Sequence, residues 1–178
     1  MYQPHLFVDD AAVSIRYAGW AEQSELDGDA VFVRCFAWNH GLSTAEDCSV
    51  MVDKVWLNDQ RISLFARSAL SWTGKAGTER FAARKLLAGQ ANGVRVDGCK
   101  IDNVTQALQI LSEASHAGTG YHWYTEQGVY TIDLIAQSSS FWATPARYSM
   151  SVQFEASETG LSLSVVGGRE RRHLLRIL

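Results

Sequence analysis

The sequence predicts an α+β fold: a mostly antiparallel β-sheet of about eight or nine strands, with two helices packed on one face. Three observations predict it. Several segments alternate apolar and polar residues, with the two-residue period of a half-buried strand. Short connections that contain glycine, asparagine or aspartate join such segments into hairpins. Two further segments follow the spacing of an amphipathic helix.

The first strands are read from the N-terminal end. HLFVD (5–9) and AVSIRYAGW (12–20) are expected to pair around a turn at 9–11. AVFVRCFAW (30–38) is apolar on both faces, as expected of a central strand. CSVMVDKVWL (48–57) and RISLFA (61–66) form a predicted hairpin, with Trp56, Leu57, Ile62 and Leu64 as its buried anchors.

Two predicted helices follow. TERFAARKLLAGQ (78–90) is rich in helix formers. NVTQALQILSEASHAG (103–118) carries a cap at Asp102 or Asn103 and a glycine stop at Gly118. Its apolar stripe is formed by Val104, Ala107, Leu108, Leu111 and Ala114. The solvent-exposed face of this helix has no pair of ionisable side chains at catalytic spacing. We therefore interpret the helix as a packing element.

Two more hairpins complete the prediction. GYHWYT (120–125) and GVYTIDLIA (128–136) are joined through a connection that includes Gly128. RYSMSVQFE (147–155) places Tyr148, Met150, Val152 and Phe154 on one face, and ASETG joins it to LSLSVV (161–166). A chain of 178 residues predicts one domain, which could be subdivided into an all-β part over 1–75 and an α+β part over 76–178.

Composition narrows the class of protein. No apolar run reaches the roughly 20 residues that cross a bilayer, and the N-terminal stretch lacks the pattern of a signal peptide. Three cysteines at wide spacing, without a CxxC pair, indicate buried thiols in a reducing compartment. The sequence therefore predicts a soluble cytoplasmic protein without a membrane partner.

Chemical motifs provide no catalytic or cofactor prediction. The chain lacks GxSxG, GxxxxGK[ST] and GxGxxG. Cys35, His40 and Cys48 have ligand atom types but not the compact spacing of a zinc site. We predict no metal, cofactor or catalytic residue. An enzyme whose site is assembled from scattered residues stays an alternative, and its sign would be a pocket lined by His40, His122 or Cys48.

Charge is unevenly distributed along the chain. Residues 1–47 hold eight of the 19 acidic side chains but two of the 16 basic ones. This imbalance argues against nucleic acid and favours a protein partner with a basic surface. Tryptophans near polar loops are further candidates for such a surface, whereas Trp38, Trp56 and Trp123 lie on predicted strands and are assigned to the core. The candidate partner-binding residues are Asp9, Asp10, Glu22, Glu25, Asp27, Asp29, Trp20, Trp72 and Trp142.

The predicted function is a non-enzymatic protein-binding module, such as a bacterial immunity or inhibitor-type protein that masks a basic partner surface. The alternative is a self-associating component of a secretion or phage-type assembly. That alternative uses sheet edges and the arginine-rich tail GGRERRHLLRIL (167–178).

One local resemblance supports the alternative. NVTQALQILSEAS followed by two strands resembles the short N-terminal domain of secretins and TonB-dependent receptors, over residues 81–132. The stretch lacks the additional strand that these domains carry between their two helices. The resemblance implies an assembly role and assigns no functional residue.

Overall fold

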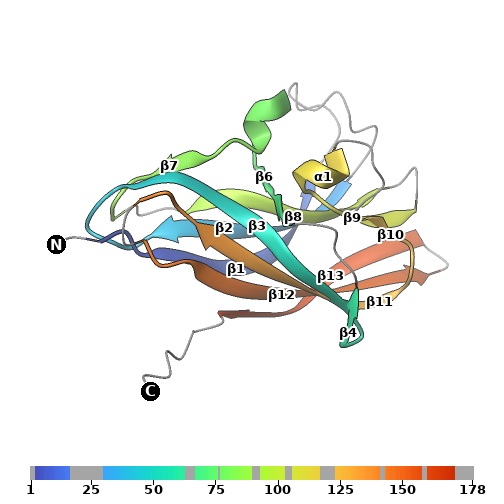
Figure 1. The fold of residues 1–178 in the computed structure, drawn as a ribbon. Coiled ribbons are helices and arrows are strands. Elements are labelled where there is room, and N and C mark those ends of the chain that lie inside the picture. Colours follow the sequence, from blue (N-terminus) through green and yellow to red (C-terminus); the bar gives the residue numbers. More distant parts are fainter. Residues whose placement is uncertain are drawn as a thin grey trace, which may run out of the picture.

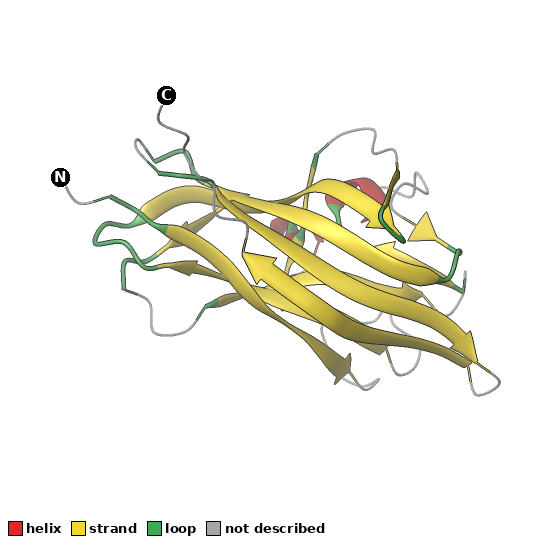
Figure 2. Ribbon diagram, turned by 90° about the horizontal axis from the view of Figure 1, so that it is seen from below, coloured by secondary structure: helices red, strands yellow, loops and turns green. Residues whose placement is uncertain are grey.

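The computed structural model describes residues 3–16, 30–62, 67–75, 77–89, 93–102, 106–116, 123–140, 143–157 and 160–170. Within these ranges the protein is nearly all-β, with two antiparallel sheets stacked face to face (Figures 1 and 2). The α+β prediction is therefore wrong, because thirteen strands form the described structure and its helices are single turns.

The six-stranded sheet has the order β1-β2-β8-β9-β10, with β6 paired to β8 beside β9. The long strands β1 and β2 pair from Leu6 opposite Asn39 to Arg16 opposite Ala30. Both β2 and β8 lie in the interior of the sheet. Its strands are β1 (Leu6–Arg16), β2 (Ala30–Asn39), β6 (Ser71–Trp72), β8 (Val94–Asp102), β9 (Ala107–Ile110) and β10 (Trp123–Tyr124).

The seven-stranded sheet has the order β13-β12-β11-β3-β4, and the short strands β5 and β7 also pair with β3. Its long central strands bring together distant parts of the chain, since Val52 on β3 lies opposite Leu134 on β11. Its strands are β3 (Ala45–Leu57), β4 (Gln60–Ile62), β5 (Ser68–Ala69), β7 (Arg84–Leu86), β11 (Gly128–Gln137), β12 (Ala146–Ser157) and β13 (Gly160–Glu170).

The core lies between the two sheets and is built largely from alternate residues of the long strands. On β2 the inward residues are Val33, Cys35 and Ala37, and all three are fully buried. The seven-stranded sheet contributes side chains such as Met150 and Phe154, which are also buried. Removing a large apolar side chain from water contributes about 1.5–3 kcal/mol, so this face-to-face burial is the main stabilising term.

The segment 68–72 closes one side of the sandwich because it hydrogen bonds to both sheets. Its first residues pair with β3, and the amide of Leu70 donates to the Val50 carbonyl at 2.7 Å. Its last residues pair with β8, and the amide of Ser71 donates to the Leu111 carbonyl at 2.9 Å. A strand that changes sheets in this way forms a corner of the sandwich.

The opposite side is formed by the two long edge strands. β1 ends the six-stranded sheet, β13 ends the seven-stranded sheet, and these two strands contact each other. A parallel bridge between His5 and Thr144 also links the start of β1 to the residues just before β12. Both long sheet edges therefore lie on the same side of the molecule.

The first predicted helix, 78–90, is absent from the described residues. A single 3₁₀ turn, η1 (Gly77–Arg80), is followed by strand β7, which pairs with the start of β3. The residues of this segment favour a helix locally, but pairing with β3 makes part of it a strand. Tertiary context commonly outweighs helix propensity, which is worth under about 1 kcal/mol per residue.

The second predicted helix, 103–118, is also wrong. Residues Ala107–Ile110 form strand β9, and the helical part is the single turn α1 (Glu113–His116). All four residues of β9 are buried, on both faces of the strand. Such a run satisfies a helical apolar pattern as well as a buried-strand pattern. The resemblance to secretin N-terminal domains depended on this helix and loses its basis.

The hairpin predictions had mixed outcomes. The β12–β13 and β3–β4 hairpins are confirmed by their antiparallel register. Asn58 and Asp59 connect β3 to β4 with φ of 46° and 66°, as a type I′ turn requires. Leu57 of that hairpin is buried, Trp56 and Ile62 are half-buried, and Leu64 lies outside the described residues.

The other two predicted hairpins are wrong. β10 pairs with β9 in one sheet, whereas β11 belongs to the other sheet. The segments 5–9 and 12–20 do not pair with each other, because residues 6–16 form the single strand β1. A register shift between Asp9 and Ala12 stands where the turn was expected.

Candidate binding surface on the six-stranded sheet

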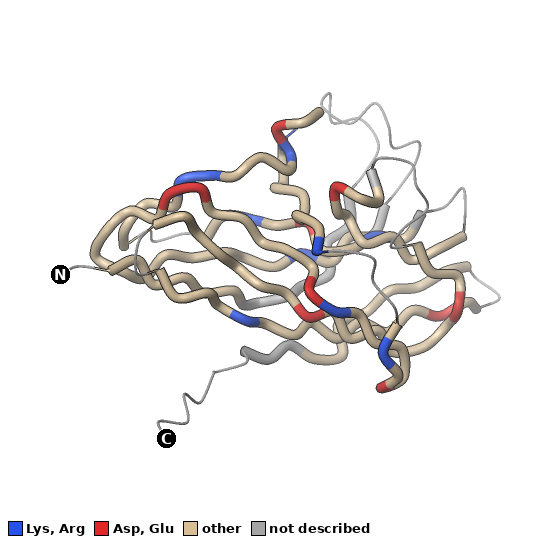
Figure 3. The backbone as a smooth tube through the Cα atoms, in the orientation of Figure 1, with Lys and Arg blue, Asp and Glu red and all other residues tan. Residues whose placement is uncertain are grey.

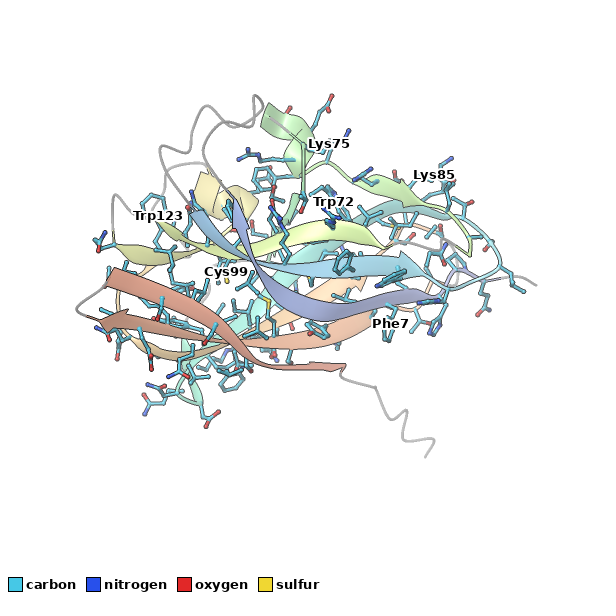
Figure 4. All side chains as sticks on the ribbon, turned by 180° about the vertical axis from the view of Figure 1, so that it is seen from behind. Phe7, Trp72, Lys75, Lys85, Cys99 and Trp123 are labelled. Carbon is cyan, nitrogen blue, oxygen red and sulfur yellow. The ribbon has the colours of Figure 1, made fainter. Side chains whose placement is uncertain are left out.

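The outer face of the six-stranded sheet carries a group of aromatic rings at one end. Phe36 and Trp38 alternate with the inward residues of β2 and are half-buried. Phe7 on β1 lies opposite Trp38 in the register, and the exposed His40 follows β2 directly. Figure 4 looks onto this sheet, with Phe7 labelled on β1. We call Phe7, Phe36, Trp38 and His40 the aromatic platform.

The platform rings contact one another in series. The ring centroids of Phe36 and Trp38 are 6.1 Å apart, and those of Trp38 and His40 are 5.7 Å apart with planes 18° from parallel. Phe7 meets His40 edge-on, at 5.7 Å and 77°. These separations lie in the favourable range for aromatic pairs, so the rings hold each other in place.

Gly93 sets how closely the platform lies on the sheet. A Cβ atom at this position would come within 2.6 Å of Cε2 of Trp38 and 2.9 Å of Cβ of Phe36. Any other residue would push the indole away from the backbone. The glycine therefore allows Trp38 to rest directly against the chain that enters β8.

Asn39 organises the loops beside the platform. Its buried side-chain amide donates to the carbonyls of Ser43 at 2.8 Å and Leu86 at 3.0 Å. Its Oδ1 accepts from the amides of His5 at 3.1 Å and Gly41 at 3.0 Å. These bonds hold the chain after β2 beside the chain after β7.

Two exposed leucines lie on the loops that Asn39 joins. Leu42 is 72% exposed and Leu87 is 58% exposed. The loops also carry the ion pair of Lys85 with Glu46, at 3.0 Å. Figure 3 shows the acidic start of β3 beside the basic strand β7 at this end of the molecule. The rings thus have an apolar and partly charged border.

Farther along the same outer face, a buried ion pair fixes β2 to β8. Nε of Arg34 donates to Oδ1 of Asp97 at 2.6 Å, and the Thr73 hydroxyl donates to the same oxygen at 2.6 Å. The Arg34 guanidinium also lies 5.2 Å from the centroid of the Phe32 ring. Thr73 follows the sheet-changing segment, so the cluster ties that segment to the sheet that bears the platform.

The outer face of the seven-stranded sheet is polar and internally hydrogen bonded. Asp133 is buried and accepts from Nε1 of Trp56 at 3.2 Å and from the Ser149 hydroxyl at 2.6 Å. The hydroxyls of Thr131 and Ser151 lie 3.1 Å apart. These polar groups have partners within the sheet, so they stabilise the fold.

A second buried carboxylate on this face binds two arginines. Asp53 accepts from Nε of Arg67 at 2.6 Å and from Nη1 of Arg147 at 3.2 Å. Burial acts to raise the pKa of Asp53, but the hydrogen bonds and charges of the two arginines outweigh it and lower the pKa. The cluster joins β3, β12 and the residue before β5.

The residues predicted from sequence to bind a partner are not gathered at one described site. Trp72 is in the core with 1% of its surface exposed, and its indole donates to the Ala82 carbonyl at 2.9 Å. Trp72 was predicted to lie at a partner surface, but the structure buries it in the corner between the sheets. Asp9 and Asp10 are part of β1, at the register shift between β1 and β2. The others lie outside the described residues: Trp20, Glu22, Glu25, Asp27, Asp29 and Trp142.

Sequence reasoning missed the platform because it assigned Trp38 to the core. β2 is a central strand as predicted, but its outer face at Phe36 and Trp38 stays partly exposed. The signal was present as aromatic residues at alternate positions 32, 36 and 38 of one strand. The predicted helices were expected to cover a sheet face, which made exposure of these rings unexpected.

The ionisable groups of the described chain do not gather into a metal site: they include no cluster of three or more histidine, cysteine, aspartate or glutamate side chains. Cys35, Cys48 and Cys99 are buried and form no disulfide, and burial raises the pKa of both Cys48 and Cys99. Among the described helices, none has the length and apolar character needed to span a membrane.

Comparisons with known proteins add no family. No family model matches the chain, and no curated protein or solved structure matches it.

Proposed function

We propose that the protein is a non-enzymatic binding module that contacts a partner protein through the aromatic platform. The observation that carries the proposal is the set of four rings that stay partly exposed on one outer face. Burying such rings is favourable, and exposed apolar groups on a soluble protein commonly mark an interaction site.

The residue types support a protein partner. Interface centres are enriched in aromatic residues and arginine, with a polar rim around them. The platform supplies Trp38 and Phe36, Arg95 lies opposite Phe36 in the register, and the Lys85–Glu46 pair lies on the bordering loops. The exposed Leu42 and Leu87 extend the apolar area on the same border.

The narrower prediction of an immunity or inhibitor-type protein depends on the acidic residues of 9–29. Their side chains fall outside the described part of the structure, so this prediction stays a prediction. The assembly alternative gains no specific support, because the two long edge strands β1 and β13 contact each other.

The test is photo-crosslinking in cells of the source organism, with p-benzoylphenylalanine in place of Phe36. A matched variant carries the same group in place of Thr131, on the outer face of the other sheet. We expect a discrete protein adduct from position 36 and none of that mass from position 131. An absence of adduct at position 36, or the same adducts from both positions, would contradict the proposal.

A further inference from the structure

Arg95 is the cationic residue of β8 that lies opposite Phe36 in the register. Its side chain is exposed, and its backbone is held on both sides, by β2 and by the amide of Thr73 that donates to its carbonyl at 3.0 Å. Among the described residues it takes part in no ion pair. A fixed backbone therefore presents at the border of the platform a guanidinium that has no ion-pair partner in the described part of the chain.

The other cationic side chains of this region are already engaged. Arg34 is paired with Asp97, and Lys85 is paired with Glu46. The guanidinium of Arg84 lies 5.5 Å from the centroid of the Trp72 ring. Arg95 therefore differs from its cationic neighbours in having its charge available to a ligand.

A partner that covers Phe36 also removes water from Arg95, because the two residues are direct cross-strand neighbours. A guanidinium has five N–H donors and no acceptor, and it stays charged at any physiological pH. Burying that charge at the interface without a partner would cost several kcal/mol of binding free energy. The partner must therefore supply an acceptor, and a carboxylate offsets the cost best because it can accept two parallel N–H bonds.

Building on the proposed function, we infer that the partner protein presents an aspartate or glutamate to Arg95 while its apolar side chains cover Phe36 and Trp38. The recognised feature is an acidic residue beside an apolar one. The basic partner surface predicted from sequence concerns the acidic residues of 9–29. Of these, Asp9 lies opposite Phe36 in the β1–β2 register, on the side of Phe36 away from Arg95.

The test is selection of random twelve-residue peptides displayed on phage against the immobilised full-length protein. Four forms are compared: wild type, Arg95→Glu, Trp38→Ala and the matched control Arg61→Glu. Arg61 is an exposed arginine on the short strand β4 of the other sheet, so its substitution makes the same charge change away from the platform.

We expect wild type and Arg61→Glu to select peptides with an acidic residue next to aromatic or aliphatic ones. Recovery of those peptides should fall about tenfold on Arg95→Glu, which corresponds to a loss of about 1.4 kcal/mol. Arg95→Glu should instead select lysine- or arginine-bearing peptides. Circular dichroism of each variant shows that it is folded.

The remaining outcomes separate the inference from the proposed function. Acidic peptides recovered equally on Arg95→Glu, or basic peptides recovered on wild type, overturn the inference and leave the platform as the binding surface. Peptides that bind Trp38→Ala as well as wild type show that they bind elsewhere, which overturns the proposed function and the inference together. A failure to enrich any peptide on wild type counts against both.

Discussion

The outer faces of the two sheets differ although their inner faces are alike. Both sheets bury aliphatic side chains between them. Outside, the seven-stranded sheet carries hydroxyls and carboxylates that bond to one another, as at Asp133 and Ser149. The six-stranded sheet carries the partly exposed aromatic platform. The buried carboxylate of Asp133 is hydrogen bonded within the chain, whereas the aromatic rings of the platform stay partly exposed.

The largest expected effect comes from Asp133→Ala on the polar face. The substitution leaves the Trp56 indole N–H and the Ser149 hydroxyl without their shared acceptor. We expect the free energy of unfolding to fall by about 3 kcal/mol in urea titrations. Thr131→Ala, which removes one partly exposed hydroxyl, is the control. A loss below about 1 kcal/mol for Asp133→Ala would show that the polar face does not stabilise the fold.

Gly93→Ala should have the next largest effect, and it acts on the platform. The added methyl would approach the Trp38 ring and Cβ of Phe36 too closely. We expect a loss of about 2 kcal/mol and a changed near-ultraviolet circular dichroism spectrum from the displaced indole. Gly74→Ser, at a turn position with open space, tests substitution strain alone. An unchanged spectrum for Gly93→Ala would contradict the close packing of Trp38.

Asp53→Asn tests the ion cluster on the polar face through pH. Because the folded pKa of Asp53 lies below its ordinary value of 3.8, its charge stabilises the folded state above that pH. The contribution is lost as the pH falls through 3.8 toward the folded pKa. We expect Asp53→Asn to cost about 1 kcal/mol at pH 7 and to unfold with a weaker pH dependence below pH 4. Identical acid unfolding curves would contradict the cluster's role.

The smallest effect on stability is expected from Arg95→Gln. An exposed side chain without an ion pair contributes little to folding, so the free energy of unfolding should change by less than about 0.5 kcal/mol. Thermal unfolding followed by circular dichroism measures it. A loss above 1 kcal/mol would mean that Arg95 stabilises the fold. The platform face would then resemble the polar face, whose charged groups support the fold.

The parts of the fold that were predictable from sequence are those with unambiguous local patterns. The alternation of apolar and polar residues from Tyr148 to Phe154 fits only a half-buried strand, and β12 confirms that strand. The largely apolar run at 107–110 fits either a helix or a strand that is buried on both faces, because both place apolar residues at close spacing. Strand partners that lie far apart in sequence, such as β3 and β11, leave no local signal.

The candidate site was less predictable than the fold. Trp72 was expected near a polar loop and Trp38 in the core, yet Trp72 is buried in the corner segment and Trp38 lies on an outer face. Their environments are set by which strands pair and by the absence of covering helices in the described chain. Neither property can be read from the residues beside each tryptophan.

The pairing of early strands with late ones has a consequence during protein synthesis. β2 finds its inner neighbour β8, and β3 finds β11, after some sixty or more further residues have been made. On a ribosome that adds roughly 5–20 residues each second, β2 and β3 each wait several seconds for the strand that covers their second edge. The nascent chain is therefore expected to depend on chaperones until β11 emerges.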